Sequence, residues 1–153
     1  GPFDMRQVRD RLDGARWAVE NADVAASLEV IATDALSVEE GVAAGRRILE
    51  RPPGQRPDAV FAANDLVALG VLQSLSAGGS LLVPEQIALI GFDDISFAAA
   101  AAVPISSMQQ PARAIGQTAL RILLEEVGDP GLIPRQTVFR PELVARASTR
   151  PRP

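Results

Sequence analysis

The amino-acid sequence predicts an α/β fold in which a parallel sheet is flanked by helices. Three short apolar runs, at residues 28–32, 59–63 and 87–90, alternate with longer segments whose apolar residues recur every three or four positions. Short apolar runs bounded by turn residues are typical of strands buried on both faces of a parallel sheet. Their alternation with helical segments indicates βαβ units with right-handed crossovers.

The composition supports one globular domain and excludes several kinds of chemistry. Of the 153 residues 47% are hydrophobic and 22% charged, which is enough apolar material for a core. All 15 basic residues are arginine, and the chain has no Cys, His, Lys or Tyr. This excludes a Cys or His nucleophile, a Ser-His-Asp triad, a P-loop lysine and a thiolate or imidazole zinc site. We therefore expect no enzyme, no metal and no cofactor, and the net charge of -4 argues against nucleic-acid binding by this chain.

Targeting signals are also absent from the sequence pattern. No apolar run approaches the roughly 18 residues of a membrane span, and no basic start precedes an apolar segment. We expect a cytoplasmic protein without membrane contact. The N-terminal Gly1-Pro2 is also compatible with a processed or truncated start.

Two helices are predicted in the first half of the chain. Residues 5–21 carry one apolar face, with Asp4 as the N-cap and Trp17 as a partly buried core residue rather than a ligand-stacking one. A second helix begins at Ser37, which matches a capping box with Glu40. The two predicted apolar faces consist of Val8, Leu12, Ala15 and Val19, and of Val38, Val42, Gly45 and Leu49.

The middle of the chain continues the alternation. Asn64 caps a third helix, and Gly91 ends the strand at 87–90. Residues 95–103 are mostly alanine and form either a helical turn or a surface loop, and a further strand follows at 105–108.

The last part of the chain is predicted to hold one long helix and one strand. Pro111 is placed at the first helical position of a helix over 112–127. The final strand is predicted at 136–139, with a short continuation at 143–145. The helix carries an apolar stripe of Ile115, Ala119, Ile122 and Leu123.

Polar residues directly follow two of the buried strands. Asn64 comes after the run at 59–63, and Asp93 and Asp94 follow the run at 87–90. Open α/β sheets bind their ligands at the carboxyl ends of their strands. We therefore expect Asn64 and Asp93 to share one depression at that edge.

Four motifs, in order, give a resemblance more specific than fold class. They read A-V-F-A-A-N-D-L-V-A-L-G-V-L, V-P-E-Q-I-A-L-I-G-F-D-D-I, S-M-Q-Q-P-A-R-A-I-G and E-L-V-A-R-A-S-T. In this order and spacing the chain, from Pro2 to Thr149, resembles the second half of the effector-binding domain of LacI/GalR-family transcription regulators. That domain has a periplasmic-binding-protein-like fold of two subdomains that enclose the ligand between them. The resemblance therefore implies that this chain presents a half-site open on one side, which binds effector weakly or not at all. The resemblance implies that residues 1–107 and 136–150 form the C-terminal subdomain, that residues 108–135 are a crossover segment and helix of the N-terminal subdomain, and that the DNA-binding headpiece lies outside this sequence.

The resemblance also implies ligand-binding roles for five positions. Arg11 matches the family's arginine for ligand hydroxyls or carboxylates, while Asn64, Asp93 and Gln110 match its polar contacts at strand ends. An arginine fork, an amide and a carboxylate suit the vicinal hydroxyls of a sugar. Leu36 stands where family members often place an aromatic ring, so stacking on a sugar face is lost.

Each role has a structural alternative. Asn64 is also a good helix cap, Asp93 and Asp94 are also turn formers, and Gln110 also precedes a proline in an extended position. Arg11 is otherwise a solvated helix residue paired with a nearby acid.

The resemblance implies a ligand-sensing and dimerising part of a regulator, whose small polar effector controls operator binding through the headpiece. The implied dimer interface comprises the helix after Asn64 and residues 97–105. Two alternatives stay open: a fragment of a periplasmic sugar-binding transport protein, and a receiver-like or phosphatase-like enzyme, which the lack of lysine disfavours. The helix at 112–127 lacks its usual partner subdomain, so we expect it to dock on its own sheet, to exchange with a second copy, which we favour, or to be poorly ordered.

Overall fold

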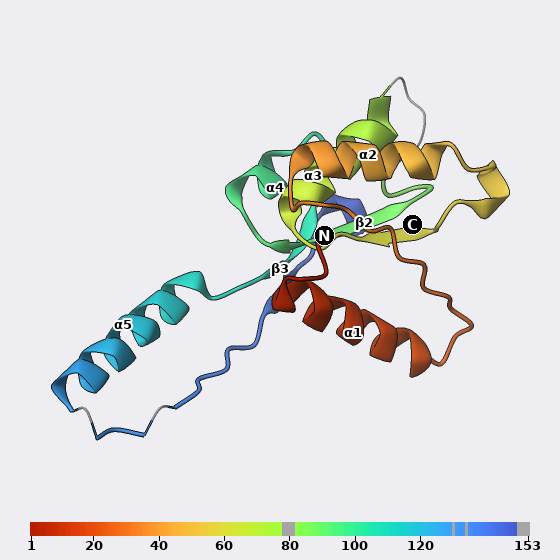
Figure 1. Ribbon diagram of the computed structural model, residues 1–153. Helices are drawn as coiled ribbons and strands as arrows, with labels where there is room; N and C mark the ends of the chain where they lie inside the picture. The colour runs from red at the N-terminus through yellow and green to blue at the C-terminus, as the bar shows by residue number, and fades with distance from the viewer. Residues whose placement is uncertain (78–81, 130, 134, 150–153) are drawn as a thin grey trace.

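The structure is a computed structural model that describes residues 1–77, 82–129, 131–133 and 135–149. Within these residues one sheet has the strand order β1-β2-β3-β4 (Figure 1). The strands are β1 (Ala59–Phe61), β2 (Ala88–Asp93), β3 (Ser106–Gln109) and β4 (Glu142–Val144). The first three run parallel and β4 is antiparallel to β3, so the predicted α/β class with a parallel sheet is confirmed.

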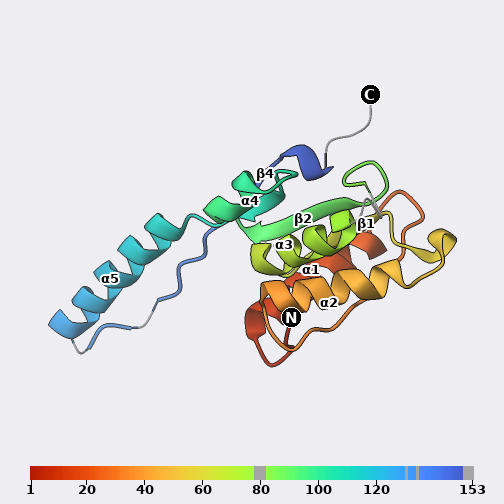
Figure 2. The ribbon, with the colours of Figure 1, turned by 90° about the horizontal axis from the view of Figure 1, so that it is seen from above.

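Helices lie on both sides of this sheet. α2 (Val38–Leu49) and α3 (Asp65–Ser76) pack together on one side, and α1 (Arg6–Glu20) lies on the other (Figures 1 and 2). The short α4 (Ser96–Ala100) shows that the alanine-rich stretch forms a helical turn.

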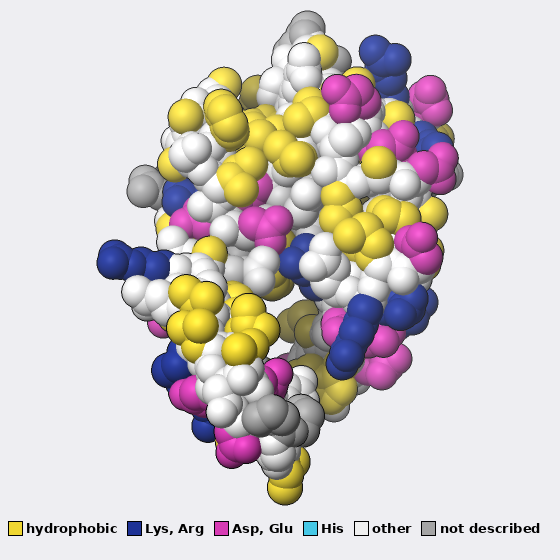
Figure 3. Space-filling model, turned by 60° about the vertical axis from the view of Figure 1, so that its left-hand side comes forward, with side chains coloured by type: hydrophobic (Ala, Val, Ile, Leu, Met, Phe, Trp, Pro, Cys, Tyr) yellow, Lys and Arg dark blue, Asp and Glu magenta, His cyan; other side chains and the backbone are white. Residues whose placement is uncertain are grey.

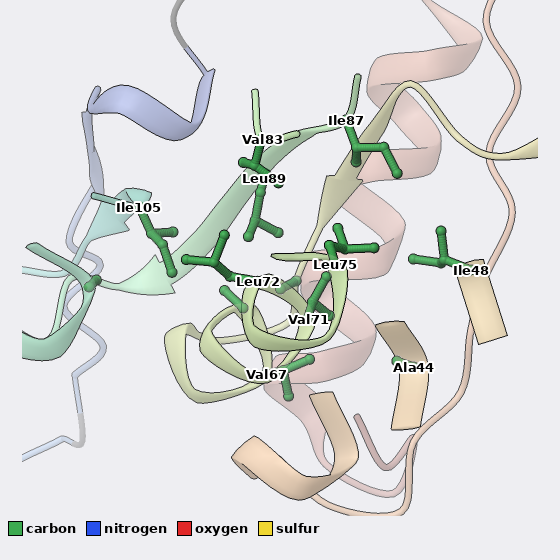
Figure 4. Packing of buried hydrophobic residues seen from close by; sticks show 13 residues of the cluster. Ala44, Ile48, Val67, Val71, Leu72, Leu75, Val83, Ile87, Leu89 and Ile105 are labelled. Atoms are coloured by element: carbon green, nitrogen blue, oxygen red, sulfur yellow. The ribbon is translucent and has the colours of Figure 1, made fainter. Parts of the chain in front are cut away.

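α3 is the centre of the hydrophobic core. It lies between α2 and the sheet, and therefore buries residues around most of its circumference rather than along one stripe. Figure 4 shows its side chains meeting those of β2 and α2. The buried apolar residues include Ala44, Ile48, Val67, Val71, Leu72, Leu75, Val83, Ile87, Leu89 and Ile105.

Glycines allow α2 and α3 to approach closely. A Cβ added at Gly70 would overlap the carbonyl oxygen of Val38 and lie 2.8 Å from the Cα of Gly41. The buried positions of α2 are Gly41, Ala44, Gly45 and Ile48, so the predicted face is shifted by about one residue. The Ser37 cap is confirmed, because its side chain accepts from the Glu40 backbone N–H, although the Glu40 carboxylate accepts from Asp34 N–H rather than returning to Ser37.

Two predicted strands are wrong. Residues 28–32 form no ladder; Arg47 of α2 donates to the carbonyl of Ala32, and Arg51, just after α2, pairs with Glu29. Residues 136–139 are also irregular, with 136–138 exposed and Phe139 half-buried; the strand forms instead at β4, close to the predicted continuation at 143–145, and Val144 stands opposite Ser107.

Several local expectations also differ from the structure. The N-cap of α1 is Met5 without a side-chain cap, so Asp4 does not fill that role. Trp17 points outward and is 67% exposed, which contradicts a core position. β2 continues through Gly91 to Asp93, and Pro111 is the N-cap of the last helix rather than its first residue.

That last helix, α5 (Ala112–Gly128), projects from the body as an arm (Figures 1 and 2). It does not dock on its own sheet, and none of its residues is buried. Of the predicted stripe, Ile115 and Ile122 are half-buried and Leu123 is exposed. Within the described residues, no helix is long and apolar enough to cross a membrane.

Candidate functional site

The carboxyl ends of β1 and β2 lie side by side. Phe61 stands opposite Ile90 in the parallel register, so the residues that follow these strands emerge at the same edge. Asn64 and Asp93 therefore lie at one sheet edge, as predicted from the strand pattern. The arm α5 leaves the body at this edge through β3, and Figure 3 shows a hollow between the arm and the body.

Arg11 reaches this edge from α1 and ties three groups together. Its Nη1 donates to the Ala63 carbonyl at 2.5 Å and its Nη2 to Asp93 Oδ1 at 3.3 Å. The guanidinium also lies 3.8 Å from the ring centroid of Phe92, within cation-π range. The Arg11 side chain is only 12% exposed, so the alternative of a solvated helix residue is wrong.

The charge of Arg11 is retained in this setting. Burial lowers the pKa of Arg11, and the neighbouring Asp93 carboxylate acts in the opposite direction. An arginine pKa starts so high that the side chain stays protonated near neutral pH. The site therefore holds a fixed cation beside a carboxylate.

Gln110 completes the contacts of Asp93. Its Nε2 donates to Asp93 Oδ1 at 2.5 Å, so Oδ1 receives both Arg11 and Gln110. Within the described residues, Asp93 Oδ2 accepts no hydrogen bond. The carboxylate is about one third exposed and can accept further hydrogen bonds from a polar ligand.

Asn64 is used mainly as a cap. Its Oδ1 accepts from the Val67 backbone N–H at 2.9 Å, and its Nδ2 donates to the Leu36 carbonyl at 3.3 Å. The predicted helix cap is therefore confirmed. Leu36 is half-buried against the core cluster and adds an aliphatic surface next to the cap.

A buried acid that was not predicted as functional lies below the Asp93-Asp94 turn. Asp65 is 1% exposed; its Oδ1 accepts from Ser107 Oγ at 2.7 Å and its Oδ2 from the Ile95 N–H at 2.8 Å. Ser107 Oγ in turn accepts from the Asp94 N–H at 3.0 Å. Burial is the main cause that raises the pKa of Asp65, against the hydrogen bonds from Ser107 and Ile95 that lower it.

Asp94 is held from the side by two further residues. Gln109 Nε2 donates to Asp94 Oδ2 at 2.8 Å, and Arg146 Nη1 lies 2.7 Å from Asp94 Oδ1. No aligned hydrogen bond reaches that Oδ1 within the described residues, so the contact with Arg146 is an ion pair. Arg146 was visible in the sequence only as part of the last motif, and no periodicity singles it out.

The arrangement suits polyhydroxylated ligands. A fixed guanidinium, a carboxylate with a further acceptor site and an amide match alternating hydroxyl donors and acceptors. In the described part of the chain, no group of three or more His, Cys, Asp or Glu residues is arranged to hold a metal ion.

Comparison with known proteins decides the family. The periplasmic binding protein-like domain matches residues 2–149. The chain belongs to this family. It is similar to the ribose operon repressor of Escherichia coli K12, at 34% identity over 97% of this chain and 44% of that protein. It is also similar to the transcriptional regulator CelR of Thermobifida fusca, at 35% identity over 97% of this chain and 43% of that protein.

Solved structures of LacI-type regulators share the fold. A complex of the regulator CelR with cellobiose matches with a TM-score of 0.86 at 35% identity, covering 97% of this chain and 44% of that one. A LacI family regulator from Enterococcus faecalis V583 with bound ribose matches with a TM-score of 0.79 at 28% identity, over 93% and 49%. The resemblance to LacI/GalR regulators and the periplasmic-binding-protein-like fold are thus confirmed, and the chain spans less than half the length of the curated relatives it matches.

Proposed function

We propose that this chain is the ligand-sensing part of a LacI/GalR-type transcription regulator. It binds a small polar effector, a sugar or a related molecule, at the carboxyl edge of the sheet. The bound effector controls operator DNA binding by a headpiece outside this chain, in the cytoplasm and without any catalytic step. The observation that carries the proposal is the Asp93 carboxylate shared by Arg11 and Gln110 at this edge.

Each side chain at the edge has a separate role in this proposal. Arg11 is locked on Phe92 and the Ala63 carbonyl, so its remaining N–H groups donate to ligand oxygens with little loss of side-chain entropy. Asp93 Oδ2 accepts a hydrogen bond from a ligand hydroxyl. One side-chain N–H of Gln110 donates to Asp93, and its side-chain carbonyl oxygen accepts a hydrogen bond from the ligand.

Asn64 and Leu36 contribute less than a free amide and an aromatic ring. The Asn64 carbonyl is used by the cap, which leaves one amide proton for the ligand. Leu36 covers the ligand with aliphatic atoms only. This favours recognition by hydrogen bonds over ring stacking.

The proposed organisation follows the family. Residues 1–107 and 136–150 form the C-terminal subdomain, and residues 108–135 are the crossover and a helix of the N-terminal subdomain. The chain pairs with a second copy through α3 and residues 97–105, where Phe97 and Leu66 are exposed. The relatives quoted above are regulators, and no observation on this chain favours a transport protein instead.

A titration followed by NMR tests this function. D-ribose, D-glucose and cellobiose are added separately to the ¹⁵N-labelled chain up to tens of millimolar, roughly the range where a one-sided site binds. We expect concentration-dependent shifts of the Arg11 Nε–H and the Gln110 side-chain amide for at least one sugar, and loss of the Gln110 shifts in Arg11→Ala.

The control is Arg6→Ala, which removes an exposed arginine of the same helix that pairs with Asp10. It should bind like the unchanged chain. Shifts confined to other surfaces, or no shifts with any of the three sugars, contradict the proposed site for them. Micromolar affinity of the chain alone contradicts the one-sided site.

A further inference from the structure

The Asp93-Asp94 turn has an unusual backbone. Asp93 has φ 103° and Asp94 has φ 57°, so two consecutive non-glycine residues lie in the left-handed region. Such residues persist there only where surrounding contacts determine their conformation. The contacts that hold this turn therefore control where the Asp93 carboxylate points.

The strongest lateral contact comes from Arg146. The ion pair with Asp94 is largely withdrawn from water, since the side chains are 18% and 7% exposed. Arg146 Nη1 also donates to the Ile105 carbonyl at 2.8 Å, and its own N–H donates to Ser106 Oγ at 2.7 Å. Because its backbone and its side chain are both fixed, Arg146 is a rigid anchor for Asp94.

The anchor acts on the ligand edge through one peptide unit. Asp94 is followed by Ile95, which Asp65 holds from below, so the turn is fixed on that side. Asp93 precedes Asp94, and Oδ1 of the Asp93 carboxylate accepts hydrogen bonds from both Arg11 and Gln110. A change of φ at Asp94 moves this carboxylate relative to its two donors.

We propose that Arg146 is a positioning residue of the ligand site. It touches no ligand and holds Asp94 in the left-handed conformation, which places the Asp93 carboxylate against Arg11 and Gln110. The inference rests on the proposed function for its effect on ligand affinity, whereas its effect on the turn is independent of any ligand.

The location of Arg146 adds a consequence. Gln109 contacts Asp94 on the chain segment that leaves for α5, and Arg146 contacts it on the segment that returns from α5. Asp94 therefore ties both connections of the arm to the residue next to the ligand-binding carboxylate. Release of Arg146 loosens the turn and the returning segment together.

The test uses three variants of this chain: Arg146→Gln, Arg146→Lys and Asp94→Asn. The matched control is Arg140→Gln, an exposed arginine on the same returning segment. The readouts are the ligand-free NMR signals of the Gln110 side-chain amide and the Arg11 Nε–H, the melting temperature, and affinity for D-ribose, D-glucose and cellobiose.

We expect Arg146→Gln and Asp94→Asn to shift the Gln110 and Arg11 signals and to weaken sugar binding about tenfold, with Arg146→Lys restoring part of both. A double variant that combines Arg146→Gln with Asp94→Asn is measured beside them and should lose no more affinity than either single one, because the two residues act through one contact. Arg140→Gln should change nothing.

A lower melting temperature with unchanged Gln110 and Arg11 signals overturns the proposal, because Arg146 is then only a structural contact. If Arg146→Gln fails to fold, the same comparison is made with Arg146→Lys and Asp94→Asn. If the unchanged chain binds none of the sugars, the proposed function fails for them, while the ligand-free signals still decide the positioning role.

Discussion

Gly91→Ala probes the contact between β2 and the buried Asp65 side chain at the carboxyl edge of the sheet. A Cβ at Gly91 would overlap Asp65 Oδ1 and lie 3.2 Å from its Cγ and 3.3 Å from the Cβ of Ala68. Asp65 is the first residue of α3, which is packed against the core, so the helix cannot retreat. The carboxylate must rotate instead.

Rotation of Asp65 breaks the hydrogen bonds from Ser107 Oγ and the Ile95 N–H. Hydrogen bonds to a charged group contribute about 1.5 to 3 kcal/mol each. Overpacking by one methyl group costs about 1 to 3 kcal/mol. With partial relaxation we expect Gly91→Ala to lower the free energy of unfolding by about 3 to 5 kcal/mol, a large share of the roughly 5 to 15 kcal/mol typical of a domain.

Urea unfolding followed by circular dichroism measures this change. Gly116→Ala is the matched control, because no atom lies within 4 Å of a Cβ built there and α5 is helical around it. It should leave stability unchanged or raise it by up to about 1 kcal/mol. A loss below about 1 kcal/mol for Gly91→Ala would refute the close packing of Asp65 on Gly91, as would full additivity with Asp65→Ala.

Three further substitutions test other contacts. Asn64→Ala removes the cap on the Val67 N–H and should cost about 1 kcal/mol in urea unfolding, so an unchanged midpoint would contradict the cap. Gly70→Ala forces a Cβ into the backbone of Val38, Val42 and Gly41, which cannot rotate away, and should cost about 3 kcal/mol or more, against no loss for Gly116→Ala. Burial raises the pKa of Asp65 in the folded chain, so the folded state holds the carboxyl proton more tightly than the unfolded state does. Stability therefore falls as pH rises from the ordinary carboxyl pKa through the raised pKa. Asp65→Asn should flatten this part of the pH profile of the melting temperature.

The sheet and its carboxyl edge were predictable because burial on both faces leaves a clear pattern. The runs before Asn64 and before Asp93 are apolar on every residue, and polar side chains begin where each strand leaves the core. That change of polarity marks the carboxyl edge without any knowledge of tertiary contacts. Asn64 was also predictable as a cap, since its local chemistry requires no distant partner.

The two wrongly predicted strands show that an apolar run does not contain the information that determines strand pairing. A run of apolar residues records a preference for burial, but strand formation also requires a free ladder edge in register. Among the described strands the outer edges of β1 and β4 are free, but residues 28–32 and 136–139 pair with neither, and Glu29 contacts Arg51 instead. Trp17 fails for a related reason, because helical periodicity places it on a face without saying what lies opposite.

The site itself was only partly predictable. Arg11 and Gln110 were identified by resemblance, and the structure brings both to Asp93. Asp65 and Arg146 were missed because a buried polar network depends on residues distant in sequence, which leave no periodic signal.

The arm α5 shows a sequence preference that the described chain does not satisfy. Leu120 and Leu124 are 58% and 63% exposed, yet full burial of such a side chain contributes about 1.5 to 3 kcal/mol. α5 has 17 residues, and most of the stability of a helix in a protein comes from packing of its apolar face, while the i,i+4 pair of Arg121 with Glu125 adds only about 0.2 to 0.5 kcal/mol. The helix therefore gains most of its stability only when its apolar side is covered. Because Gln109, the last residue of β3, pairs with Asp93 and α5 follows β3 along the chain, the arm begins beside the carboxyl edge of the sheet.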